Sequence, residues 1–256
     1  MDPNTFTTIG ISAATALLIK GADAPAHTLN LLWEATIGRI NPYLEKSIKE
    51  HRNNVLKYEN DIKQEVVGIP SDQINQNPDI GVLGPALEAS KYYVENEEVR
   101  KMFAKLIGAE LDLRKADKVH HSFVDVIRQM SSNDARLLPL LPLTGPLAEI
   151  KLYSSNGHSY KRFGPRDILF IPPVIIDNFE DNAVSLNNLE RLGLIDSDHV
   201  RSITNESAYA GYKNLPYYQI AQQELVQNPT EFTRVEIGTG LFNVTTYGEL
   251  FKSICL

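Results

Sequence analysis

Four polar side chains in the middle of the sequence are of the types that acid-base chemistry uses. Glu97, Glu98 and Arg100 lie near the predicted start of one helix, and His120 lies on the helix that follows. An acid, a cation and a titratable base that converge could form a small catalytic site. The same residues could instead cap a helix and join two helices through a buried ion pair. Because acidic residues at a helix start commonly serve the cap and the helix dipole, we favour the structural interpretation.

The sequence carries no recognisable metal or nucleotide motif. His120 and His121 are adjacent, so a helix would direct them to different faces, and neither Cys-x-x-Cys nor His-Glu-x-x-His occurs. Gly238-Thr-Gly240 lacks the third glycine of a dinucleotide fingerprint, because Asn243 stands in its place. A phosphate-binding P-loop and a Gly-x-Ser-x-Gly elbow are also missing. We therefore expect no cofactor, no metal, no small-molecule ligand and no enzymatic activity.

An apolar segment without charges, from Phe6 to Leu18, precedes Lys20. A membrane-spanning helix needs about 20 apolar residues, so this segment is too short to cross a bilayer. Its small residues suit close helix packing, either within the fold or between chains. Insertion into a membrane after a trigger is the alternative. The candidate association residues are Ile9, Ile11, Leu17, Leu18 and Trp33.

Periodic patterns predict a mainly α-helical chain with a smaller α+β part. We divide it into an N-terminal helical region over residues 1–70, a helical core over 71–130 and a C-terminal module over 131–256. Helices are expected near residues 27–37, 41–67, 97–111, 121–130, 185–195 and 217–226, where apolar side chains recur at helical spacing. Residues 148–153 alternate like a strand, and residues 233–244 read as a hairpin with its turn at Gly238-Thr-Gly240.

The order of these C-terminal elements is that of a winged helix. In winged-helix proteins the helix before a segment such as Leu192–Ile195 enters the DNA major groove, and here it would offer Asn187, Asn188 and Arg191. Asparagine can read adenine, but one cation gives little phosphate contact. The formal net charge of -7 also repels nucleic acid. We therefore favour packing of this helix within the protein, with nucleic-acid regulation as the alternative.

The middle of the sequence resembles the abortive-infection alpha family of bacterial antiviral defence. The matching stretches are "GPALEASKYYVENEEVRKMFAKLIGAELD" and "VHHSFVDVIRQMSSNDARLL", and the endings "NLERLGLI" and "FNVTTYGELFKSICL" are also similar. The matching positions are Pro85, Ala86, Glu98, Arg100, Phe103, Leu106, His120, Phe123, Ile127, Ser131, Asp134 and Ala135. The resemblance implies protection of a bacterial population from phage, and it carries over no catalytic residue.

These observations together predict a non-enzymatic defence protein that works by self-association or by binding a protein partner. The single cysteine, Cys255, permits no internal disulfide, and the beginning of the sequence lacks a secretory signal. We therefore expect a cytoplasmic protein. The competing hypotheses are a winged-helix regulator that binds nucleic acid and an effector whose N-terminal segment perturbs a membrane.

Overall fold

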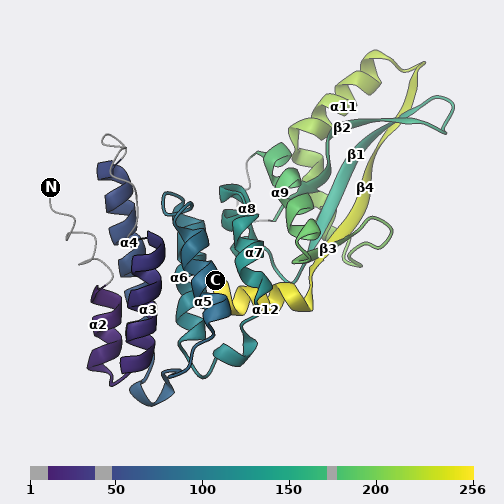
Figure 1. The fold of residues 1–256 in the computed structure, drawn as a ribbon. Helices are drawn as coiled ribbons and strands as arrows, with labels where there is room; N and C mark the ends of the chain where they lie inside the picture. The colour runs from purple at the N-terminus through teal and green to yellow at the C-terminus, as the bar shows by residue number, and fades with distance from the viewer. Residues whose placement is uncertain (1–10, 38–47, 172–177) are drawn as a thin grey trace. The chain divides into compact units, whose positions relative to one another are not determined.

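The computed structural model describes residues 11–37, 48–171 and 178–256, and these fold into two units. The first unit comprises residues up to Ser132 together with Leu250–Leu256, and the second comprises Asn133–Glu249. The division into three regions that the sequence suggested stays a prediction. Each unit has its own core and is described by itself below (Figure 1).

The first unit is built from helices. They are α2 (Ile11–Ile19), α3 (Asp23–Thr36), α4 (Ile48–Val67), α5 (Ile80–Ser90), α6 (Glu97–Glu110) and α7 (Ser122–Arg128), with 3-10 turns η2 (Ser71–Gln73) and η3 (Ala116–Lys118) and the last residues of α12 (Thr246–Cys255). The helices predicted near 27–37, 97–111 and 121–130 are confirmed as α3, α6 and α7. The first residues of the helix predicted over 41–67 lie outside the described residues, and the rest is confirmed as α4.

Polar side chains fix where these helices begin. Asp79 accepts a hydrogen bond from Gly81 N at the start of α5, and Asn96 accepts one from Val99 N at the start of α6. Such caps satisfy N–H groups that the first helical turn leaves without a partner. Helix α5 therefore begins at Ile80 and contains Pro85.

The core of the first unit is aromatic and tightly packed. Trp33 stacks on Tyr58 with ring centroids 5.9 Å apart, and Phe123 meets Phe251 edge-on at 5.2 Å. Helices α4 and α6 approach closely at Gly108, where an added Cβ would lie 2.5 Å from Glu65 Cβ. Glycine is therefore needed at this crossing because it has no side chain.

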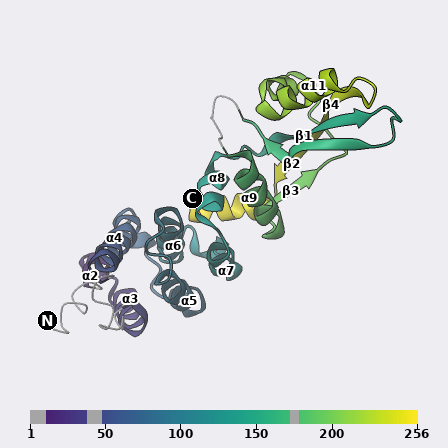
Figure 2. The same ribbon diagram turned by 90° about the horizontal axis from the view of Figure 1, so that it is seen from above.

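The second unit is an antiparallel four-stranded sheet with helices. Its elements are α8 (Ser132–Leu137), η4 (Leu138–Leu140), β1 (Thr144–Ser154), β2 (Tyr160–Leu169), α9 (Phe179–Arg191), β3 (Ile195–Asp198), α10 (Ser207–Ala210), η5 (Gly211–Asn214), α11 (Pro216–Gln227), β4 (Phe232–Val244) and the start of α12. The strand order is β2-β1-β4-β3. Helix α11 lies along one face of the sheet, and α9 packs against β2 and β3 (Figures 1 and 2).

The face of the sheet beneath α11 holds the core of this unit. Ala148 and Ile150 on β1 and Ile168 on β2 are buried against Tyr209 and Tyr212. The Tyr209 hydroxyl donates to Gly240 O at 2.6 Å, which anchors this layer to β4. Partly buried Phe163, Val235 and Ile237 extend the same apolar face, as strand alternation requires.

The winged-helix prediction for the C-terminal module is wrong. Residues 233–244 do not turn at Gly238-Thr-Gly240, because β4 runs unbroken from Phe232 to Val244 and pairs along its length with β1. The helix expected from Ser185 already begins at Phe179 and ends at Arg191, before Gly193, whose φ is 75°. This part is mixed α/β, with a four-stranded antiparallel sheet in place of a wing.

Candidate functional site

The four residues of the predicted polar cluster do not converge. Glu97 and Glu98 are exposed in the first turn of α6, where Glu97 pairs with Lys101 at 2.5 Å. His120 follows the opposite end of α6, is exposed, and has Nδ1 2.6 Å from Ser122 Oγ. An α-helix of 14 residues such as α6 is about 20 Å long. The length of α6 therefore separates His120, which lies beyond the C-terminal end of the helix, from Glu97 and Glu98 in its first turn.

Arg100 has a structural environment within the first unit. Its side chain is buried, and Nε donates to Asp61 Oδ2 at 2.7 Å, while Nη1 donates to Val94 O at 3.2 Å. The ion pair connects α6 with α4. A buried cation of this kind is held by its partners and is not presented to a ligand.

The residues of the proposed recognition helix form α9, and two of them are bound to neighbouring side chains. Asn188 Nδ2 donates to Asp134 Oδ2 at 2.7 Å, and Arg191 Nε donates to Asn188 Oδ1 at 3.0 Å. Asn133 Nδ2 also donates to Ser185 Oγ at 2.7 Å, which ties α8 to the same helix. The structure leaves Asn187 exposed on α9. Helix α9 is thus an internal packing element along most of its length.

The association residues divide between core and surface. Leu17 and Trp33 are buried inside the first unit, whereas Leu18 is exposed. Ile9 lies outside the described residues, and only the backbone of Ile11 is described. Beside Leu18, the side chain of Ile19 is 82% exposed at the end of α2. The helix end therefore presents two adjacent apolar side chains to solvent.

Further apolar side chains are exposed on the elements that pack with α2. Leu31 on α3 and Val67 at the end of α4 are both exposed. Lys20 Nζ donates to the carbonyl oxygens of Val67 and Ile69, so the end of α2 lies beside the end of α4. We call Leu18, Ile19 and Val67 the N-terminal apolar surface. Within the described residues, no helix is long and apolar enough to span a membrane.

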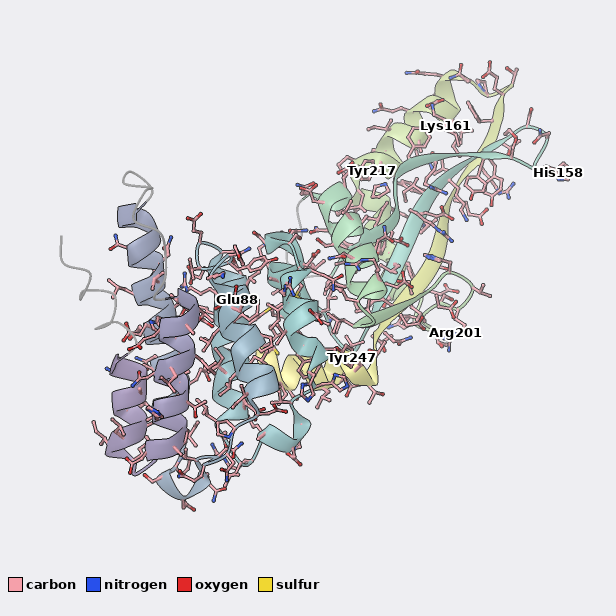
Figure 3. All side chains as sticks on the ribbon, viewed as in Figure 1. Glu88, His158, Lys161, Arg201, Tyr217 and Tyr247 are labelled. Carbon is pink, nitrogen blue, oxygen red and sulfur yellow. The ribbon has the colours of Figure 1, made fainter. Side chains whose placement is uncertain are left out.

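The sheet carries a charged aromatic face that the sequence interpretation did not identify. Strand alternation places it opposite the apolar face beneath α11. Its members are Glu149, Lys151, Tyr153, Tyr160, Arg162, Arg234 and Glu236, and we call this set the tyrosine face. Lys161, by contrast, lies on the α11 side, where Nζ is 2.8 Å from Glu224 Oε1 (Figure 3).

The tyrosine face is arranged in rows across the three strands. Tyr153 is paired with Tyr160 on one side and with Arg234 on the other, and the two tyrosine rings lie 5.6 Å apart. In the next row, Lys151 is paired with Arg162 and Glu236. Direct cross-strand neighbours interact through their side chains, so each row acts as one set of contacts.

Ion pairs and ring contacts hold the cations of this face. Glu149 bridges Lys151 Nζ at 2.5 Å and Arg162 Nε at 3.0 Å. Arg234 Cζ lies 4.0 Å from the centroid of the Tyr153 ring, a cation-π contact. Burial lowers the pKa of Lys151, but the hydrogen bond to Glu149 and its charge outweigh burial, and the net pKa is raised. Lys151 therefore remains a cation at neutral pH.

Next to this face, one oxygen of a buried carboxylate has no hydrogen-bond partner among the described residues. Asp167 is 6% exposed, and its Oδ1 accepts no hydrogen bond, although His199 Nε2 lies 3.6 Å away. Burial raises the pKa of Asp167, the charges of His199 and Arg166 oppose this shift, and those of Glu190 and Glu149 add to it. Within the described residues, no group of three or more His, Cys, Asp or Glu side chains could hold a metal ion.

One signal in the sequence could have revealed the tyrosine face. Glu149, Lys151 and Tyr153 alternate with the buried Ile150 and Leu152, which marks one polar and one apolar face of a strand. The neighbouring residues on β2 and β4 are set by sheet register, which no local pattern specifies.

Comparison with known proteins gives one match. A family model described as abortive infection alpha matches residues 50–255, which confirms the resemblance seen in the sequence. No curated protein and no solved structure matches the chain. The matched range begins within α4 and runs through both units.

Proposed function

The chain belongs to the abortive infection alpha family, and on that premise we propose that it protects bacteria from phage by self-association rather than by catalysis. The contact between copies is made through the N-terminal helices. The proposal assigns the protein to the cytoplasm, where its single, buried Cys255 stays reduced.

The exposure of the N-terminal apolar surface is the observation that supports this proposal. Leu18, Ile19 and Val67 present apolar side chains to water at neighbouring helix ends. Removing apolar area from water stabilises a contact by about 25 cal/mol per Å². Clustered exposed apolar residues commonly mark sites of protein association, so a second copy of the same surface is a fitting occupant.

The proposal excludes a catalytic role for the predicted polar cluster. Arg100 is engaged with Asp61 in the interior, and His120 lies beyond the opposite end of α6 from Glu97 and Glu98. These positions support a structural role for each of them.

Infection assays on bacteria that carry the chain test this function. We expect that Leu18→Ser/Ile19→Ser abolishes protection, because two polar hydroxyls replace the apolar contact. The matched control is Val226→Ser, which changes an exposed apolar residue on α11 in the second unit. Protection that survives the double substitution would contradict the proposal.

A membrane measurement in the same assay separates the alternative. If the apolar segment perturbs the host membrane, infected cells should admit a membrane-impermeant dye as protection begins. We expect them to exclude the dye at that stage. Dye entry that Leu18→Ser/Ile19→Ser prevents would favour the membrane effector over self-association.

A further inference from the structure

We propose that the tyrosine face of the second unit binds single-stranded nucleic acid. Bases stack on the two tyrosine rings, and phosphates contact the neighbouring cations. The residues that make these contacts are Tyr153, Tyr160, Lys151, Arg162 and Arg234. This function goes beyond the association of N-terminal helices and rests on different residues.

The ring pair supplies the stacking surface once Arg234, which lies over the Tyr153 ring, and Lys151, which lies over the Tyr160 ring, turn from the rings to the phosphates. Tyr153 and Tyr160 are cross-strand neighbours with centroids 5.6 Å apart, and Tyr160 is exposed. Every base has a π face, so aromatic side chains bind single strands without requiring a particular sequence. In a duplex the base faces are covered by stacking, which leaves these rings without a contact.

Glu149, one of the two acids of the face, lies deeper than the guanidinium group that it holds. The Glu149 side chain is 15% exposed and that of Arg162 is 43% exposed, whereas Glu236 and Arg234 are exposed to similar extents, 48% and 53%. In each ion pair the arginine uses Nε for the carboxylate, Glu149 in one case and Glu236 in the other. The terminal nitrogens, which carry four of the five N–H donors of a guanidinium, are not required for these pairs. They can donate to a phosphate.

Charge complementarity favours a polyanion over other partners. Lys151, Arg162 and Arg234 outnumber Glu149 and Glu236 on this face. A lipid surface or an apolar protein partner would require an apolar patch, and this face is polar and aromatic instead. An acidic peptide matches the charges but offers few rings to stack on the tyrosines. Nucleic acid is the occupant that uses both features.

The net negative charge of the chain keeps the salt dependence of this binding shallow. The formal net charge of -7 repels a long polyanion, so only the three cations of the face contribute phosphate contacts. For single strands the logarithm of affinity falls with the logarithm of salt concentration by about 0.7 per neutralised phosphate. Three contacts therefore predict a slope of about -2.

Fluorescence anisotropy of the full chain with labelled oligouridylate and oligothymidylate tests the proposal. We expect saturable binding with the shallow salt slope, and about tenfold or greater weakening by Tyr153→Leu/Tyr160→Leu. Leucine keeps an apolar side chain at each position but removes the ring. Tyr153→Phe/Tyr160→Phe retains the rings and should keep binding within about twofold.

Two further variants make the test specific. Arg234→Ala should weaken binding and reduce the salt slope by about 0.7, because one phosphate contact is lost. The control Lys161→Ala removes a cation from the opposite side of the sheet, where it pairs with Glu224, and should leave binding unchanged. Thermal unfolding of each variant shows whether its fold is intact.

Several results would overturn this assignment. No saturable binding at low salt would do so, as would equal loss with Lys161→Ala or equal affinity for a blunt duplex. Tighter binding of a polyglutamate peptide than of either oligonucleotide would assign the face to an acidic protein segment. Retained binding by a folded Tyr153→Leu/Tyr160→Leu variant would remove the stacking role.

Discussion

Arg100 Nε donates to Asp61 Oδ2 across 2.7 Å, and this ion pair joins α6 to α4 inside the first unit. The arginine side chain is buried, and its Nη1 also donates to Val94 O. Arg100 and Asp61 thus hold together α6 and α4, which are separated in sequence. This relationship explains Arg100 without any role in chemistry.

Removing one member of this pair should destabilise the fold. We expect Arg100→Ala to lower the free energy of unfolding by about 3 kcal/mol, because Asp61 is left as a half-buried charge without its partner. Glu97→Ala breaks an exposed pair with Lys101 and should leave stability nearly unchanged. Urea unfolding measures both. An Arg100→Ala protein with unchanged stability but no protection would instead indicate a chemical role.

The close crossing of α4 and α6 at Gly108 leads to a second prediction, in which the sign of the change in the free energy of unfolding is the test. Alanine has a higher helix propensity than glycine, so Gly108→Ala judged on α6 alone should stabilise by about 1 kcal/mol. The added Cβ, however, would lie 2.5 Å from Glu65 Cβ, and the helices must separate. We expect a net loss of about 1–3 kcal/mol in thermal or urea unfolding. A stabilised variant would show that the helices do not cross this closely.

The buried carboxylate of Asp167 predicts a dependence of stability on pH. Burial raises its pKa in the folded chain, so between its ordinary value near 3.8 and the raised value the folded state binds more protons than the unfolded state. The contribution of Asp167 to stability therefore falls as pH rises through this interval. Above this interval the ionised carboxylate, with Oδ1 lacking a hydrogen bond, is unfavourable.

Substitution of this residue isolates its effect. Asp167→Asn should raise the free energy of unfolding at pH 7 by about 1 kcal/mol and should flatten its change between pH 4 and 7. His199→Ala removes a side chain that lies 3.6 Å from Asp167 Oδ1 and opposes the effect of burial on the Asp167 pKa, so it should lower stability. Urea unfolding across this pH range measures both variants. Asp167→Asn that destabilises at pH 7 would contradict the assignment of an unfavourable charge.

Local patterns predicted the helices of the first unit and the strand at 148–153, which is part of β1, but they misplaced the start of α9 and predicted a turn inside β4. Apolar side chains at helical spacing predicted α3, α6 and α7 correctly, because a helix is specified by neighbours in sequence. The two glycines of β4 were read as a turn. The structure gives them another role: Gly238 makes room for Lys151 and Glu149, and a Cβ at Gly240 would lie 2.8 Å from Asp198 O. Both reasons depend on strands that are distant in sequence.

The candidate functional sites likewise could not be predicted from local sequence patterns. The charged residues Glu97, Glu98, Arg100 and His120 are conspicuous in the sequence. Burial takes Arg100 into the core, and the length of α6 separates His120 from the two acids. The residues of the tyrosine face come from three strands, and Tyr160 and Arg162 lie in a segment whose Gly164-Pro165 pair obscures the strand pattern. Only the sheet register brings them beside Tyr153 and Lys151.

Self-association through the N-terminal apolar surface is tested most directly by size-exclusion chromatography with light scattering on the full chain. Point substitutions serve better than truncation, because Leu17 and Trp33 are core residues that a truncation would remove. We predict that the unmodified chain has at least twice the mass of one chain and that Leu18→Ser/Ile19→Ser has the mass of one, with Val226→Ser unchanged. An unmodified chain that is monomeric at every concentration, or a double variant with the same oligomeric mass, would contradict the account.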